Sequence, residues 1–305
     1  MNKYLHINRV EFLITENCTS ECRHCSNVSS DKTNSYITAE KGISILKEVQ
    51  KEYRLESVMT FGGEPLLYPD SVTAILNYAR ETGVPTRQII TNAFWSRNKS
   101  RIDEICLALE KAEVNNILVS VDCFHQEHLD PEIINYTLSK LAETELEGIR
   151  LHPCWYESES GNNEYDKMTR EILDGYSVHN FDISSGNILF PDGRAVENFP
   201  ERFKSLESVS DICCGKIPHT ERPDNIDAVC LNPEGFVTSQ CFGRKMEIKD
   251  FLENYDPHSD PVMKVFLEKG IEECIRASGI STEDFDISKY YSVCEACLAI
   301  RRQLA

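Results

Sequence analysis

The sequence predicts an α/β protein: a partial (β/α)6 TIM-like barrel over residues 1–199, followed by a small cysteine-rich extension over residues 200–305. In the first two-thirds, short apolar runs alternate with segments whose apolar residues recur at helical spacing, as in repeated β/α units. Six such units within about 190 residues are too few to close an eight-stranded barrel, so we expect an open one. Beyond about residue 200 this alternation ends, which places the domain boundary there.

The expected strands are short apolar runs over residues 10–14, 58–61, 87–90, 117–121, 149–153 and 181–190. The first helix begins at Ala39, with Thr38 as its N-cap. Further helices are predicted by apolar stripes at Val72, Ile75, Leu76 and Ala79, at Ile102, Ile105, Cys106 and Leu109, and at Ile134, Leu138 and Leu141, and another spans residues 165–173. In the extension we expect a hairpin over residues 228–241 and helices over 262–275 and 288–301.

Composition excludes several classes of protein. Hydrophobic residues make up 41% of the 305, which is enough for a packed core. The formal net charge of −18 repels phosphate backbones and anionic lipids, so we expect no nucleic-acid or membrane partner. No apolar run reaches the length of a signal peptide or a membrane span, which favours a cytoplasmic location. In such a reducing compartment, 13 cysteines indicate metal binding or chemistry more than disulfides.

Three cysteines follow the first expected strand in a C-x3-C-x2-C run: Cys18, Cys22 and Cys25. Three thiolates in one loop can hold three corners of a cubane iron–sulfur cluster and leave the fourth iron open to an external ligand. The alternative is a zinc knuckle. Zinc needs a fourth ligand, and His24, which lies between two of the cysteines, is poorly placed to supply it.

This spacing resembles that of the radical S-adenosylmethionine (SAM) superfamily. Gly62, Gly63 and Glu64, directly after the second expected strand, are similar to the glycine-glycine-glutamate element of that family. The resemblance implies a [4Fe–4S] cluster on Cys18, Cys22 and Cys25 and a bound SAM whose amino group meets residues 62–64. It also implies that the backbone of His24 contacts the adenine.

Further polar residues follow the third and fourth expected strands: Asn92, Ser120 and Asp122. The carboxyl ends of the strands of a (β/α) barrel form the face that carries the active site. We therefore expect these side chains to contact the ribose and methionine parts of SAM. For each of them, a helix N-cap or a turn is the alternative interpretation. His125 belongs to a short stretch that resembles part of some radical SAM subfamilies, with a solvated loop as its alternative.

The activity implied by the resemblance is reductive cleavage of SAM to a 5′-deoxyadenosyl radical, which abstracts hydrogen from a substrate. A low-potential donor such as flavodoxin or ferredoxin would supply the electron. Cys123 and Cys154 follow the fourth and fifth strands and are candidate hydrogen donors to a substrate radical, as peptide epimerases require. Buried, inert thiols are the alternative interpretation for both residues.

A second set of cysteines lies in the extension. Cys294 and Cys297 form a C-x2-C pair, and Cys241 ends the expected hairpin. With Cys214 as the upstream ligand, or Cys230 or Cys213 in its place, this set resembles the SPASM/twitch extensions that carry auxiliary [4Fe–4S] clusters. The long cysteine run of a full SPASM domain is missing, which favours a single auxiliary cluster. A structural zinc is the alternative.

Three functions remain open at this point. The first is modification of a ribosomally made peptide, by epimerisation or cross-linking. Only about nine residues precede the first expected strand, so this function calls for a separate leader-peptide recognition protein. The second is a dehydrogenase or epimerase of a small molecule such as an amino sugar or an alcohol. The third, from another class, is a zinc-binding interaction protein.

Overall fold

The computed structural model describes residues 2–27, 34–208, 221–238, 245–277, 279–281 and 285–304. Within these ranges, one sheet has the strand order β11-β10-β9-β1-β2-β3-β4-β5-β7. The strands from β1 to β7 pair in parallel. They are β1 (Leu5–Leu13), β2 (Ser57–Phe61), β3 (Thr86–Thr91), β4 (Asn116–Ser120), β5 (Ile149–His152) and β7 (Asp182–Ile183). The α/β class with a parallel sheet is confirmed.

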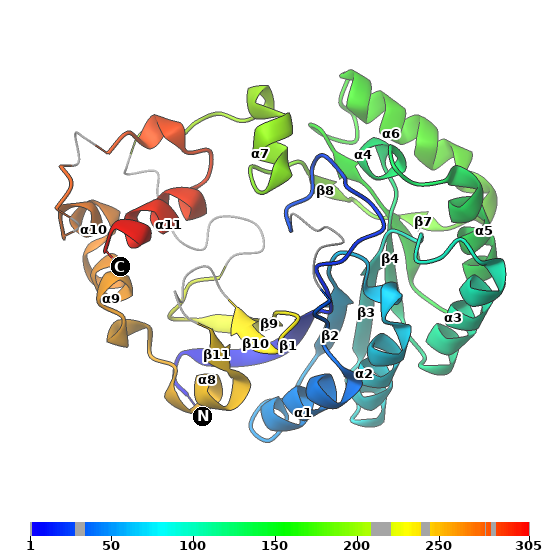
Figure 1. Ribbon diagram of the computed structural model, residues 1–305, viewed down its shortest axis with the longest axis horizontal. Helices are drawn as coiled ribbons and strands as arrows, with labels where there is room; N and C mark the ends of the chain where they lie inside the picture. Colours follow the sequence, from blue (N-terminus) through cyan, green and yellow to red (C-terminus); the bar gives the residue numbers. More distant parts are fainter. Residues whose placement is uncertain are drawn as a thin grey trace.

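Helices connect these strands and cover the outside of the sheet (Figure 1). They are α1 (Ala39–Val49), α2 (Pro69–Glu81), α3 (Lys99–Lys111), α5 (Pro131–Ala142) and α6 (Glu164–Gly175), while the one-turn helix α4 (Cys123–Gln126) follows the end of β4. The apolar stripes predicted for α2, α3 and α5 are all buried, because each faces the sheet. Thr38 caps α1 by accepting a hydrogen bond from the backbone N–H of Lys41, as predicted.

The prediction of one strand over residues 181–190 is wrong. The chain forms β7 and then β8 (Asn187–Ile188), which pairs with β6 (Cys154–Trp155) in a separate two-stranded sheet. Gly186 lies between β7 and β8 with φ of +71°, a left-handed conformation that interrupts an extended strand. A Cβ at Gly186 would lie 2.3 Å from the backbone oxygen of Pro153, so the chain passes too close there for any larger residue.

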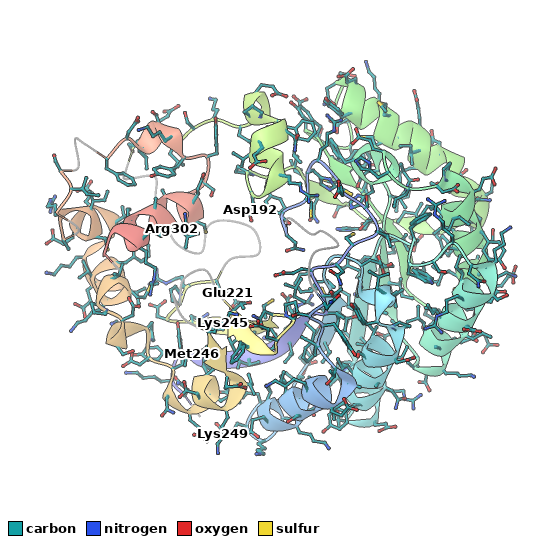
Figure 2. The ribbon with its side chains drawn as sticks, viewed as in Figure 1. Asp192, Glu221, Lys245, Met246, Lys249 and Arg302 are labelled. Carbon is teal, nitrogen blue, oxygen red and sulfur yellow. The ribbon has the colours of Figure 1, made fainter. Side chains whose placement is uncertain are left out.

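The predicted hairpin joins the main sheet. It consists of β9 (Ile226–Leu231) and β10 (Phe236–Thr238), which pair in antiparallel fashion. β9 also pairs in parallel with β1, and β10 pairs with β11 (Met246–Glu247). Figure 2 shows Glu221 and Lys245 near this edge, with Asp192 across from them beside α7 (Arg194–Asn198). The Glu221 carboxylate accepts hydrogen bonds from the backbone N–H groups of Asp227 and Ala228, which anchors the start of β9.

The remaining helices are α8 (Ile248–Asn254), α9 (Pro261–Lys269), α10 (Ile271–Ala277) and α11 (Val293–Leu304). α9, α10 and α11 lie together (Figure 1) around a small apolar cluster that includes Cys274 and Ile300. A division near residue 200 stays a prediction, since β9 lies beyond that point yet belongs to the same sheet as β1. In the described part of the chain, none of the helices has the length and apolar character needed to span a bilayer.

Candidate functional site

The loop that follows β1 is attached to the loop that follows β2. The backbone N–H of Gly63 donates to the carbonyl of Thr15 at 2.8 Å, and that of Glu64 donates to Asn17 at 2.8 Å. A Cβ at Gly63 would lie 2.0 Å from the oxygen of Asn17, and one at Gly62 would lie 2.4 Å from that of Thr15. Only glycine permits this approach, so the two glycines hold the cysteine loop directly against the end of β2.

Glu64 directly follows the two glycines, and its carboxylate is fully buried. The backbone N–H groups of Leu66 and Asn92 donate to it at 2.9 and 2.8 Å, and the Thr91 hydroxyl at 2.8 Å. Burial raises the pKa of Glu64 to about 7, although these hydrogen bonds act to lower it. The carboxylate therefore caps the short helix Pro65–Leu67 and joins it to the end of β3. Contact between Glu64 and a SAM ammonium stays a prediction.

We expect Glu64→Gln to flatten the dependence of stability on pH. The pKa of Glu64 is higher in the folded protein than its ordinary value of 4.5, so its contribution is complete below pH 4.5 and falls as pH rises towards 7. The change over that window is about 3 kcal/mol. Urea denaturation of the metal-free protein at pH 4.5, 6 and 7.5 measures it. If the wild type and the variant change in parallel, Glu64 is not the group responsible.

The three cysteines lie within one loop at this end of the sheet. Cys22 is buried, and Cys18 and Cys25 are half-buried. Burial raises the pKa of Cys18 to about 12 and also raises that of Cys22, so these two thiols are protonated when no metal is bound. A metal that binds them must displace these protons.

The spacing of the sulfur atoms bears on which metal fits. In the described ranges, His24, Asp122 and His125 form a group of possible metal ligands whose donor atoms all lie within 4.8 Å of one another. The sulfurs of the three cysteines do not form such a group. Sulfurs that share one zinc at about 2.3 Å each are at most about 4.6 Å apart. As they lie, the three sulfurs are therefore not gathered closely enough to share one zinc ion.

Asn92 connects the end of β3 to the cysteine loop. Its side-chain amide donates to the Thr19 hydroxyl at 3.1 Å and to the sulfur of Cys18 at 3.7 Å. Its carbonyl oxygen accepts from the backbone N–H of Phe94 at 2.9 Å. Ser20 lies between the first two cysteines, with its hydroxyl 3.0 Å from the sulfur of Cys22. Ser20 was not among the residues expected at the site, although a hydroxyl within the cysteine run was a signal for it.

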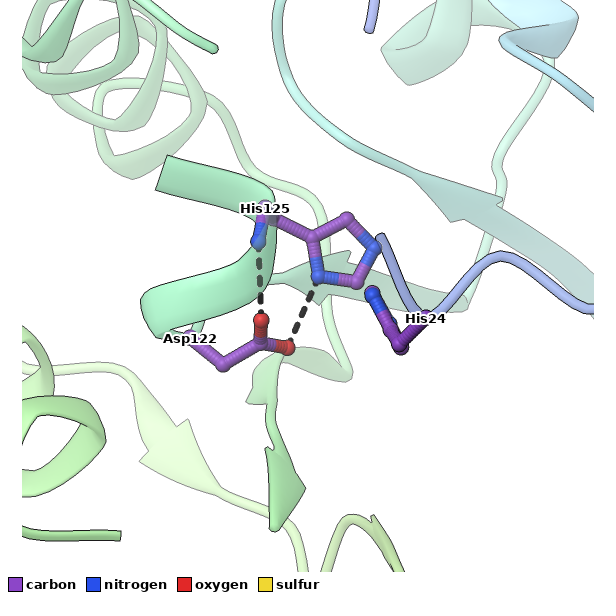
Figure 3. A group of neighbouring side chains, drawn as sticks. All are labelled: His24, Asp122 and His125. Carbon is purple, nitrogen blue, oxygen red and sulfur yellow. Dashed lines mark hydrogen bonds and ion pairs between the residues drawn. The ribbon is translucent and has the colours of Figure 1, made fainter. Parts of the chain in front are cut away.

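Asp122 is fully buried and serves as the N-cap of α4 (Figure 3). One carboxylate oxygen accepts the backbone N–H groups of Phe124 and His125, at 3.0 and 2.9 Å. The other lies 2.7 Å from His125 Nδ1 and accepts the N–H of Cys154 at 2.8 Å. Burial acts to raise the pKa of Asp122, but the charge and hydrogen bonds of His125 outweigh it, and the result is about 2.

His24 lies against this pair. Its ring centroid is 4.9 Å from that of Phe124 and 4.6 Å from that of His125. Burial lowers the pKa of His24 to about 3, so its ring is neutral. Its Nδ1 is buried and has no hydrogen-bond partner among the residues that the structure describes. Because both Asp122 oxygens already accept two hydrogen bonds each, we interpret Asp122 as the group that orients His125. Contacts of His24, Ser120 and Asp122 with SAM stay predictions.

Cys123 and Cys154 belong to a second apolar cluster that also contains Phe124, Tyr156 and Phe199. Cys123 is 4% exposed and Cys154 is 8% exposed. Burial raises the pKa of Cys123 to about 12 and raises that of Cys154 further above its usual range. Both thiols keep their S–H bond, which a hydrogen donor needs and which an inert core cysteine also has. Their role as donors stays a prediction.

The proposed auxiliary ligands are only partly described. Cys294 and Cys297 lie on α11, half-buried, and line an apolar pocket with Phe266, Cys274 and Leu298. Cys230 lies within β9, opposite Glu11 of β1. The other three candidates, Cys213, Cys214 and Cys241, lie outside the described residues. The auxiliary cluster therefore stays a prediction.

Comparison with known families bears on the N-terminal part of the chain. Residues 12–144 match the family model described as the radical SAM superfamily. This part of the chain is similar to radical SAM domains. It contains the cysteine loop, residues 62–64 and the ends of β2, β3 and β4, and its family implies a [4Fe–4S] cluster and SAM. The match covers less than half of the chain, and a search of curated proteins finds no significant match.

Solved structures with similar folds include SuiB of Streptococcus suis bound to the precursor peptide SuiA, with 14% identity and a TM-score of 0.48 over 89% of this chain and 67% of that one. Native anSMEcpe with bound AdoMet gives 14% identity and a TM-score of 0.47 over 98% of both chains. HemN, the coproporphyrinogen III oxidase of Escherichia coli, gives 13% and 0.44 over 64% and 46%. The chain thus spans about half the length of HemN.

Proposed function

We propose that the whole chain is a radical SAM enzyme in which Cys18, Cys22 and Cys25 hold a [4Fe–4S] cluster. The observation that carries this proposal is the attachment of the cysteine loop to Gly62–Glu64 through two backbone hydrogen bonds. Three thiolates hold three irons, which leaves the fourth for the amino and carboxylate groups of SAM. When bound, the cluster and SAM supply one-electron cleavage of SAM and removal of hydrogen from an unactivated C–H bond.

In this proposal, residues of the chain bind SAM, orient it and exclude water from the site. The SAM ammonium is proposed to meet residues 62–64, whose glycines lie against the backbone of the cysteine loop. Asp122 fixes the ring of His125 beside His24. The aromatic side chains of Phe124, Tyr156 and Phe199 belong to a buried apolar cluster, which would keep water away from this side of the site.

For the substrate, we propose a ribosomally made peptide, modified by epimerisation or cross-linking. The second cysteine set supports this class, by resemblance to peptide-maturing members of the superfamily. The net charge of −18 favours a partner with a basic segment, such as a leader peptide or its recognition protein. Mass spectrometry of the product separates the outcomes. One deuterium gained from solvent indicates epimerisation, and loss of two hydrogens indicates cross-linking or the dehydrogenation of a small molecule.

Anaerobic reconstitution with iron and sulfide tests the activity itself. We expect a brown protein that produces 5′-deoxyadenosine from SAM when dithionite supplies the electron. A purified protein that holds zinc at Cys18, Cys22 and Cys25, and forms no 5′-deoxyadenosine after loading, would rule the proposal out.

The auxiliary cluster has its own test. We expect the double variant Cys294→Ala with Cys297→Ala to lose about half of the iron per chain, because one cubane of two is lost. It should retain cleavage of SAM, which the first cluster performs, and lose turnover of the substrate. Cys106→Ala, which removes a buried cysteine of α3, serves as the matched control. Full iron content in the double variant would show that α11 holds no cluster.

A further inference from the structure

Two neutral side chains reach two of the three cysteine sulfurs. The hydroxyl of Ser20 lies 3.0 Å from the sulfur of Cys22, and the side-chain amide of Asn92 lies 3.7 Å from that of Cys18. Both side chains are buried, Ser20 at 5% exposure and Asn92 at 6%. Contacts of this kind, held away from water, are electrostatically stronger than the same contacts at the surface.

The direction of each hydrogen bond follows from the chemistry. A cysteine that ligates iron is a thiolate without a proton, so the Ser20 hydroxyl must donate to Cys22. The orientation of the Asn92 amide is fixed by its other contacts. Its oxygen accepts from the backbone of Phe94, which leaves the nitrogen to donate to Thr19 and Cys18.

Asn92 is itself held rigidly by residues that touch no sulfur. Its backbone N–H donates to the buried Glu64 carboxylate at 2.8 Å, and the next residue, Ala93, has a φ of +58°. The Thr91 hydroxyl, which donates to Glu64, also accepts from the N–H of Ala93. The amide is therefore in place before a cluster binds and needs no rearrangement when an electron arrives.

We propose that Ser20 and Asn92 are positioning residues that raise the reduction potential of the cluster on Cys18, Cys22 and Cys25; this rests on the proposed function. Reduction adds a negative charge, part of which resides on the sulfurs, and donors directed at those sulfurs stabilise it. Two nearby carboxylates oppose this stabilisation, because those of Glu64 and Asp122 interact unfavourably with negative charge on Cys18 and Cys22. The two donors offset these carboxylates without adding a charge that would attract water.

The test is a redox titration of the reconstituted full-length protein, followed by electron paramagnetic resonance. The signal to follow is the one that changes shape when SAM is added, which separates this cluster from an auxiliary one. We expect Ser20→Ala and Asn92→Leu each to shift the midpoint to more negative values at unchanged iron content. Ser20→Thr, which keeps the hydroxyl, should restore the wild-type midpoint. Ser71→Ala, at an equally buried serine of α2, should leave it unchanged.

Each outcome bears on the inference separately from the function. A wild-type protein that binds no iron–sulfur cluster refutes the proposed function. Variants that hold the cluster with wild-type midpoints refute the role of Ser20 and Asn92 and leave the function intact. Loss of the cluster from both Ser20→Ala and Asn92→Leu also refutes it, because these residues would then serve only to build the loop.

Discussion

Cys22→Ala is expected to abolish the reaction. Cys22 is the most buried cysteine of the loop, so no water or external thiol can easily take its place as a ligand. Two remaining thiolates cannot hold a cubane cluster. We expect iron at this site to fall to background and 5′-deoxyadenosine formation to fall by more than about 100-fold. Iron analysis and chromatography of the SAM products measure the two effects.

The control for this experiment is again Cys106→Ala. Cys106 is 2% exposed and lies on the apolar stripe of α3, so its replacement removes a buried thiol without touching the loop. That variant should keep its iron and its activity, at a small cost in stability. A Cys22→Ala protein that still forms 5′-deoxyadenosine at the wild-type rate would place the reaction elsewhere in the chain.

Gly63→Ala should have the second largest effect, although it removes no ligand. The added Cβ would lie 2.0 Å from the oxygen of Asn17 and 3.0 Å from the nitrogen of Cys18, and both are backbone atoms that cannot rotate away. The loops must separate, which strains the hydrogen bonds from Gly63 and Glu64 to the cysteine loop. We expect a loss of about 2–3 kcal/mol in the free energy of unfolding and at least a tenfold loss of SAM cleavage.

The matched control is Gly175→Ala. Among the described residues, a Cβ at Gly175, the last residue of α6, meets no atom within 4 Å beyond its own helix turn and chain neighbours. This substitution should change the free energy of unfolding by no more than about 1 kcal/mol, and in the stabilising direction. Denaturation curves measure the free energy of unfolding of both variants, and iron analysis measures how much cluster each one holds. Equal stability and equal iron content in the two proteins would show that the loop contact is unimportant.

Local sequence signals predicted the parallel core. The helix periods in α2, α3 and α5 and the Thr38 cap depend on residues close together in the chain, and the structure contains all of them. The match over residues 12–144 supports the class inferred from the cysteine spacing. These features could be predicted because the apolar face of a helix and the ligand spacing of one loop depend only on residues that are close together in the sequence.

Contacts between distant residues could not be predicted in the same way. Gly186 divides the expected sixth strand because it passes close to Pro153, which precedes it by more than thirty residues. The sequence also did not indicate that Thr91 and Asn92, from the end of β3, donate hydrogen bonds to the Glu64 carboxylate. The N-cap role of Asp122 is local and was an alternative from the sequence, but its second oxygen also accepts from the distant N–H of Cys154. In each case tertiary packing determines what a polar side chain or a glycine does.

The pairing of β9 with β1 makes the two parts of the chain interdependent. β1 lies between β2 and β9, so its backbone groups are satisfied on one side by the N-terminal part and on the other by residues after 220. Without β9, that side of β1 would present a row of unpaired amides and carbonyls to water or to a strand of another molecule. The strand that leads into the cysteine loop thus owes half of its backbone pairing to the cysteine-rich extension.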